Sequence, residues 1–240
     1  MHSYEDFLQV IATLRGENGC PWDREQTHAS LTQCMLEEAY EVVDGIRLYE
    51  ETGEDDNLRE ELGDVLLQVV MHAQIAKEEG RFSMEDVVDG ICEKMIRRHP
   101  HVFGERTLKN SHQVLEQWEE IKKKEKKEEN LRDTLERVAK AYPANIRAAK
   151  VQKKAEKAGI LLESEPKKLI AGMRKQLEEL EDSLHGAGQG EEMTGELDKK
   201  IGELLFSTVL LSRKMGLEAE NSLTNATNQF INKCVDITYF

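Results

Sequence analysis

The sequence predicts an all-α protein built as two tandem helical bundles. Apolar residues recur at helical spacing along much of the 240-residue chain. Only 5% of the residues are aromatic and four are proline, a composition that argues against a β-sandwich or a β-barrel. The second half of the chain also repeats the pattern of the first, so we expect one helical unit to occur twice.

The first helix is expected over about residues 4–14. Four apolar residues share one face of it, at Phe7, Val10, Ile11 and Leu14. The following segment, 16–23, contains two glycines and a proline and is predicted to be a loop. The next helix is expected to begin near residues 27–30.

Acidic residues dominate two consecutive helices between residues 36 and 79. Glu37, Glu38 and Glu41 lie on the first, and Glu61 and Asp64 on the second. Residues three or four apart share a helix face, so Glu38 projects with Glu41, and Glu61 with Asp64. The break at 51–57 is short and polar and contains a glycine, which favours an antiparallel pair.

An antiparallel pair would bring four carboxylates together, at Glu38, Glu41, Glu61 and Asp64. Like charges in a partly desolvated site repel and raise one another's pKa values. A hard divalent cation relieves this repulsion, and ligands that are all oxygen suit Mg²⁺ or Mn²⁺. The alternative is that these charges line the solvated faces of two amphipathic helices.

Basic and aromatic residues follow the acidic pair. Ser83 and Asp86 predict a capped helix start, and that helix ends with Lys94, Arg97 and Arg98 before a proline. Cations in a last turn also complement the helix dipole without any further role. A further helix from about residue 111 carries Trp118 and, one turn later, Lys122.

The charged run that follows predicts a domain boundary. Residues 122–130 contain almost no apolar side chain. We therefore expect a first domain over 1–123, a linker over 124–133 and a second domain over 134–240. In the second domain, the stretches 177–182 and 200–206 repeat 36–41 and 61–67, and Lys200 replaces Glu61. A lysine repels a cation, so the second unit is predicted to keep the fold and lose most of its metal affinity.

Charge and composition exclude other classes. The net charge of −14 argues against binding of nucleic-acid polymers. The chain has no run long and apolar enough for a membrane span and no secretory leader at its start, so a cytoplasmic protein is expected. The four cysteines form no Cys-x-x-Cys pair and are expected to be reduced.

The motif Glu-Glu-x-x-Glu at 37–41, followed by Glu-x-x-Asp at 61–64, resembles the MazG family of nucleoside triphosphate pyrophosphohydrolases. Three further stretches, 19–23, 61–70 and 97–103, are similar to signatures of its first domain. The resemblance implies an all-α four-helix unit that dimerisation completes, in a homodimer or a higher homo-oligomer. It also implies hydrolysis of a nucleoside triphosphate to the monophosphate and pyrophosphate.

The resemblance assigns roles residue by residue. Glu38, Glu41, Glu61 and Asp64 match the Mg²⁺ ligands. Glu37 matches the adjacent glutamate of the catalytic set, which would either support the ligands from outside or orient water. Lys94, Arg97 and Arg98 match positions that contact the triphosphate, and Trp118 and Lys122 match a Trp-x-x-x-Lys feature near the nucleotide. The base that activates water stays open among Glu37, Glu38 and Glu41. We expect the activity in the first domain.

Two other readings compete with this one. A di-iron bundle needs Glu-x-x-His on two helices, and the chain offers that motif at Glu25 and His28 with no partner in the second acidic stretch. A non-catalytic oligomerisation or regulatory module would explain the second half better than the first. A Ca²⁺ loop is set aside because no Asp-rich EF-hand motif is present.

Overall fold

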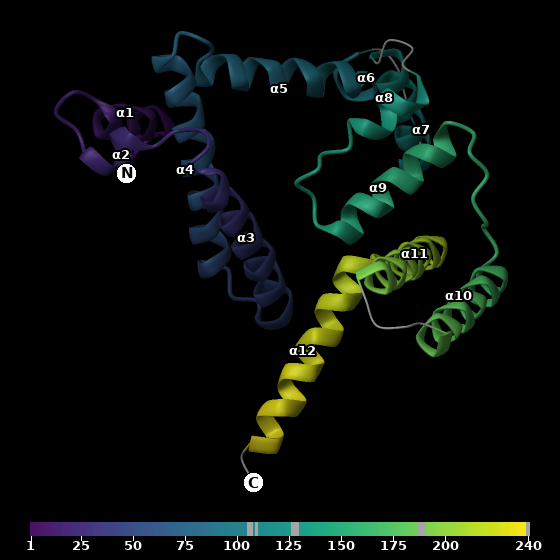
Figure 1. Cartoon of the computed structure of the whole chain (residues 1–240). Coiled ribbons are helices and arrows are strands. Elements are labelled where there is room, and N and C mark those ends of the chain that lie inside the picture. The colour runs from purple at the N-terminus through teal and green to yellow at the C-terminus, as the bar shows by residue number, and fades with distance from the viewer. Residues whose placement is uncertain (105–107, 109, 126–129, 187–190, 239–240) are drawn as a thin grey trace. The chain divides into compact units, whose positions relative to one another are not determined.

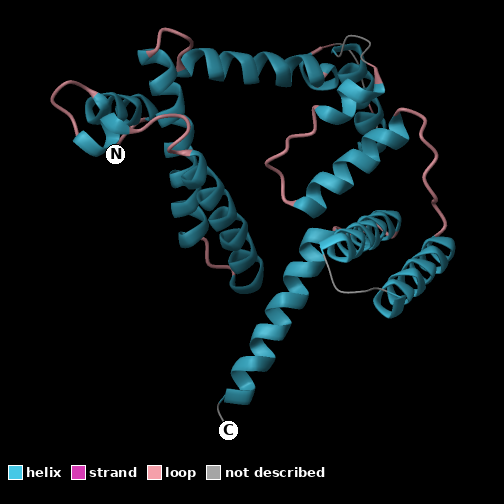
Figure 2. Cartoon of the chain, in the orientation of Figure 1, coloured by secondary structure: helices cyan, strands magenta, loops and turns pink. Residues whose placement is uncertain are grey.

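The computed structural model describes residues 1–104, 108, 110–125, 130–186 and 191–238. Within these ranges every regular element is an α-helix and none is a strand, as Figure 2 shows. The predicted all-α class is therefore confirmed. No described helix combines the length and the apolar character that crossing a membrane requires. Residues 126–129 of the predicted linker lie outside the described ranges.

The helices, which are labelled in Figure 1, fall into two compact units, residues 1–125 and 126–240. The described helices of the first unit are α1 (Tyr4–Arg15), α2 (Pro21–Glu25), α3 (Thr32–Thr52), α4 (Asp56–Glu78), α5 (Met84–Arg98), α6 (Pro100–Phe103) and α7 (Ser111–Glu125). Those of the second unit are α8 (Leu131–Glu136), α9 (Ala144–Lys157), α10 (Pro166–Gly186), α11 (Glu191–Lys214) and α12 (Ala219–Thr238).

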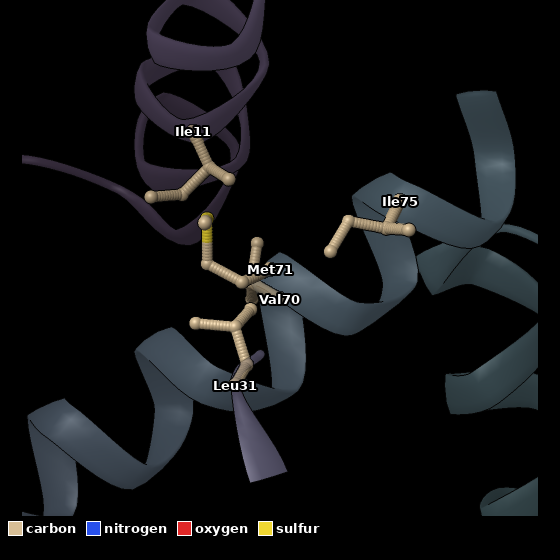
Figure 3. Close-up of a cluster of buried hydrophobic side chains, with 5 residues drawn as sticks. All are labelled: Ile11, Leu31, Val70, Met71 and Ile75. Carbon is tan, nitrogen blue, oxygen red and sulfur yellow. The ribbon is translucent and has the colours of Figure 1, made fainter. Parts of the chain in front are cut away.

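The core of the first unit lies where α1 and the turn before α3 meet the C-terminal half of α4. Its buried side chains, drawn in Figure 3, are Ile11, Leu31, Val70, Met71 and Ile75. Burying one such side chain contributes about 1.5–3 kcal/mol. This core fixes the C-terminal half of α4 and leaves the N-terminal half free to carry polar side chains.

Helices α3 and α4 pack side by side as the predicted hairpin. Gly53 ends α3 with φ 78°, a conformation that favours glycine. Gly45 lies at a close approach of the two helices, because a Cβ there would meet the Cα of Leu58 at 3.1 Å and Oδ1 of Asn57 at 3.0 Å. The close approach places acidic side chains of the two helices opposite each other.

One predicted helix start is confirmed, and two others differ from the expected boundaries for local chemical reasons. Ser83 and Asp86 form the predicted capping box at α5. The predicted loop at 16–23 instead contains the start of α2, whose first residue is Pro21, a favoured first position. Helix α3 begins later than predicted, because Thr27 and Ser30 exchange two side-chain-to-backbone hydrogen bonds of 2.9 and 3.1 Å that hold a separate turn.

The second unit contains a matching hairpin, formed by α10 and α11. Its buried apolar side chains are Val138, Leu169, Val209 and Leu210. Gln152 of α9 is 1% exposed and donates a 2.9 Å hydrogen bond to the carbonyl of Phe206. A buried amide with a partner fixes how α9 sits on α11.

Candidate active site

Three carboxylates meet between α3 and α4. Glu38 comes from α3 and Glu61 and Asp64 from α4, and one carboxylate oxygen of each lies within 4.8 Å of the others. All three residues are half-buried. We call Glu38, Glu61 and Asp64 the acidic trio. Oxygen ligands gathered in this way suit a hard divalent cation.

The trio is electrostatically strained without a cation. Burial raises the pKa of Glu38 above its usual value, and the charges of Asp64 and Glu41 raise it further. Burial also raises the pKa of Glu61, and the charge of Glu41 raises it further. A 3.0 Å hydrogen bond from Asn57 partly offsets this, because it lowers the pKa. A bound cation would favour the ionised form of these groups.

The other two predicted acidic residues lie outside the trio. Glu41 is exposed, although its charge reaches Glu38 and Glu61. Glu37 is also exposed, and its carboxylate accepts a 2.8 Å hydrogen bond from Nε2 of Gln33. Both residues follow the helical spacing of α3, which turns Glu37 about 100° away from Glu38.

Gln68 is a neighbour of the trio that sequence reasoning did not single out. It lies one turn after Asp64 on α4 and is 6% exposed. Its Oε1 is buried and has no hydrogen-bond partner among the described residues. A buried orphan acceptor is uncommon in proteins. The only sequence signal was its spacing of four from Asp64, which a core leucine would share.

His28 does not join the acidic trio. Its ring stacks on that of His72 of α4, with ring centroids 5.1 Å apart and Nδ1 atoms 2.8 Å apart. The trio holds no histidine. The described structure therefore gives His28 a different partner from the one that a di-iron site would require.

The predicted basic and aromatic residues form a second group, at the junction of α5 and α7. The guanidinium of Arg98 lies 5.4 Å from the ring centre of Trp118, and the ammonium of Lys122 lies 5.5 Å from it. His99 meets the same ring edge-on at 4.8 Å. Cations held over an indole ring are a favourable arrangement. We call Arg97, Arg98, Trp118 and Lys122 the cationic group.

Arg97 joins this group through Glu125, the last residue of α7. Nε of Arg97 donates to Oε1 of Glu125 at 2.8 Å, and Nη2 of Arg98 donates to Oε2 at 2.5 Å. These bonds lower the pKa of Glu125 to about 2. Lys94 is half-buried one turn before Arg98. Sequence reasoning assigned Glu125 to the linker, because contacts between separate helices leave no local signal.

The two groups are separate stretches of one unit. Between Asp64 and Arg98 the chain runs through the rest of α4 and the whole of α5. At 1.5 Å per residue, each of these helical stretches is about 20 Å long. The structure thus places the acidic residues and the cationic residues of the predicted site in two separate parts of the first unit.

The second unit carries a different charge at the equivalent place. Nζ of Lys200 donates to the carbonyl of Glu179 at 2.9 Å, pairs with Glu196 at 3.1 Å and also contacts the hydroxyl of Ser183. Glu203, in the position of Asp64, is exposed and lies 3.9 Å from Lys199. An ammonium group thus lies where the first unit has Glu61.

Fold and site together define the class of protein. It is an all-α protein with a carboxylate cluster suited to a divalent cation on an antiparallel helix pair, and with a separate group of cations suited to phosphate. Residues 26–103 match the MazG nucleotide pyrophosphohydrolase domain. This range contains the acidic trio, Lys94, Arg97 and Arg98, and ends before Trp118.

Three relatives match between 58% and 96% of the chain. The nucleoside triphosphate pyrophosphohydrolase of Escherichia coli strain K12 is 40% identical over 232 residues, 96% of this chain and 85% of that protein. The nucleoside triphosphate pyrophosphohydrolase/pyrophosphatase MazG of Thermotoga maritima is 38% identical over 96% of this chain and 83% of that protein. The nucleoside triphosphate pyrophosphohydrolase of Mycobacterium tuberculosis is 42% identical over 58% of this chain and 41% of its own length. The chain belongs to the MazG family.

Proposed function

We propose that this protein hydrolyses nucleoside triphosphates, ribo- or deoxyribo-, to the monophosphate and pyrophosphate, and that the first unit carries the activity. The acidic trio is the observation that carries the proposal. Three half-buried carboxylates repel one another, and a scaffold has no need of such a cluster. A metal-dependent hydrolase needs carboxylates of this kind to bind its ion. The names of the E. coli and T. maritima relatives support the same reaction.

The acidic trio, with Glu41 beside it, would hold Mg²⁺, or Mn²⁺ in its place. Such an ion polarises phosphoryl oxygens and lowers the pKa of bound water. The four side chains would position the ion, and its charge would favour the ionised form of their carboxylates. Glu37 would orient the attacking water from the exposed face of α3. Its hydrogen bond from Gln33 holds the carboxylate in place.

The cationic group would bind the phosphates. Arg97 and Arg98 present planar forks of N–H donors that match phosphate oxygens, and Lys94 adds a point charge one turn earlier. Trp118 and Lys122 would lie beside the nucleotide, and two cations already lie over the indole ring. Positioning and charge neutralisation supply most of the rate enhancement in phosphoryl transfer.

A second copy of the chain would complete the first unit. Apolar side chains of α3 and α4 remain exposed although both helices are amphipathic, among them Tyr40 at 53% and Leu62 at 52%. A helix pair with an uncovered apolar face fits half of a four-helix bundle. Pairing of two copies would bury this face against its equivalent.

The experiment that tests the function is pyrophosphate release from a panel of ribo- and deoxyribonucleoside triphosphates with Mg²⁺. Glu38→Gln and Asp64→Asn should each lower kcat by more than about a hundredfold, because even outer-shell changes cost 10–100-fold. Mg²⁺ should raise the melting temperature of the wild type but not of these variants. Circular dichroism should stay helical.

The matched control is Glu179→Gln, the equivalent of Glu38 in the second unit, which should leave the rate unchanged. A loss as large as that of Glu38→Gln would move the activity out of the first unit. Absence of pyrophosphate release from every nucleotide in the wild type would favour the oligomerisation or regulatory module instead.

A further inference from the structure

Glu125 occupies the arginine pair that the proposed function assigns to phosphate. One carboxylate accepts from Nε of Arg97 at 2.8 Å, and from Nε and Nη2 of Arg98 at 3.1 and 2.5 Å. These bonds join the end of α7 to the end of α5, 27 residues away in the chain. Three donor nitrogens of the two guanidinium groups are therefore already engaged by an anion of the chain itself.

The position of Glu125 on α7 makes it part of the cationic surface. Trp118, Lys122 and Glu125 are four and three residues apart, so they share one face of the helix. The ring of Trp118 packs against Arg98 on that face, and the ammonium of Lys122 lies over the same ring. Glu125 is thus the acidic member of an otherwise cationic and aromatic surface.

A carboxylate and a phosphate compete for the same donors, because both accept paired N–H bonds from a guanidinium. Deep lowering of the carboxyl pKa, to about 2, keeps Glu125 ionised at any working pH. It is therefore a permanent competitor, and pH does not release it. An anion that replaces it must bring more charge than one carboxylate.

We propose that Glu125 sets the affinity of the site for phosphate chains, holding Arg97 and Arg98 in the free protein and leaving them when a polyphosphate binds. This inference rests on the proposed function for the roles of the arginines. A triphosphate carries enough charge to displace the carboxylate, and a monophosphate carries less. Glu125 therefore lowers the affinity of the site for every phosphate chain that must displace it.

The test is calorimetric binding of inorganic tripolyphosphate to the full chain in EDTA, where the acidic trio holds no cation. Glu125→Gln should bind about three- to tenfold more tightly, the range expected when one or two exposed ion pairs no longer compete. Glu120→Gln makes the same charge change at an exposed position of α7 and should leave the affinity unchanged. Arg98→Ala added to Glu125→Gln should remove the gain.

Kinetics supply the second measurement. KM for the triphosphate should fall in Glu125→Gln by the same factor as the tripolyphosphate constant, and inhibition by the monophosphate should strengthen by no more than that factor. Glu125→Asp keeps the charge, so its KM and its tripolyphosphate affinity should stay close to those of the wild type. This variant separates the effect of the charge from a general disturbance of the fold. Equal or weaker tripolyphosphate binding by a folded Glu125→Gln protein would overturn the proposal.

The outcomes separate this inference from the proposed function. A wild type that hydrolyses triphosphates, with a Glu125→Gln variant of unchanged affinity and KM, contradicts the role of Glu125 alone. A wild type without hydrolysis, whose Glu125→Gln variant binds tripolyphosphate more tightly, contradicts the hydrolase and keeps the competing carboxylate.

Discussion

At the residue scale, two glutamines of α4 differ in burial and in whether the side-chain amide has a partner, and this decides their energetic role. Gln74 donates a 2.9 Å hydrogen bond to Glu78, whereas Oε1 of buried Gln68 has no partner among the described residues. A buried polar group without a partner costs about 1–3 kcal/mol. Gln68 therefore destabilises the helix that carries two members of the acidic trio.

Replacing Gln68 by methionine should stabilise the protein. The side chains have similar length, and the thioether carries no strong acceptor to leave unpaired. We expect the free energy of unfolding in EDTA to rise by about 1 kcal/mol, measured by urea denaturation. Gln74→Met is the control and should not stabilise, since it removes a paired amide. A lower urea midpoint for Gln68→Met would mean that the amide has a partner that the structure does not show.

At the element scale, a pair of histidines joins the turn before α3 to α4. The 2.8 Å contact between Nδ1 of His28 and Nδ1 of His72 needs one nitrogen to carry a proton and the other to accept. Two protonated rings would present two donors to each other. Burial lowers the pKa of His72, and the neighbouring His28 lowers it further.

Stability of the first unit should consequently fall on mild acidification. The pKa of His72 in the folded state lies below its ordinary value of 6.5, so the unfolded chain binds more protons as pH drops through 6.5. The melting temperature should fall by roughly 1–3 °C between pH 7.5 and 5.5. His72→Asn should reduce this slope, and His112→Asn, at an exposed position of α7, should not. An unchanged slope in His72→Asn would show that the pair does not titrate in this range.

Features that depend on neighbours along the chain could be predicted from the sequence, whereas contacts between separate helices could not. Periodicity located the α3–α4 hairpin, and helical spacing placed Glu38 opposite Glu61 and Asp64, because both depend on neighbours along the chain. The stacking of His28 on His72 and the bridge from Glu125 to Arg98 depend on how separate helices meet. No local pattern carries that information. Helical geometry alone predicts that Glu37 points away from the face of Glu38. The resemblance nevertheless assigned Glu37 to the catalytic set.

At the scale of the whole molecule, the two units repeat an exposed surface as well as a fold. Equivalent positions of α3 and α10, and of α4 and α11, carry apolar side chains that are at least 39% exposed, at Leu36 and Leu177, Val43 and Leu184, Leu62 and Ile201, and Leu66 and Leu205. The charges of the site changed between the units, since Lys200 replaced Glu61. An apolar face that stays exposed in both copies favours a role in association.

Disrupting this surface in the first unit should separate the copies and reduce activity together. Leu62, 52% exposed, lies one residue after Glu61 on α4, so Leu62→Asp would place a charge in the proposed interface beside the acidic trio. Sedimentation equilibrium should show a smaller oligomer than for the wild type, with a lower rate of triphosphate hydrolysis. Leu161→Asp, at a 97% exposed position away from any helix, should change neither. An unchanged oligomer in a folded Leu62→Asp protein would show that α4 does not form the interface between copies. The exposed apolar face of α4 would then have another role.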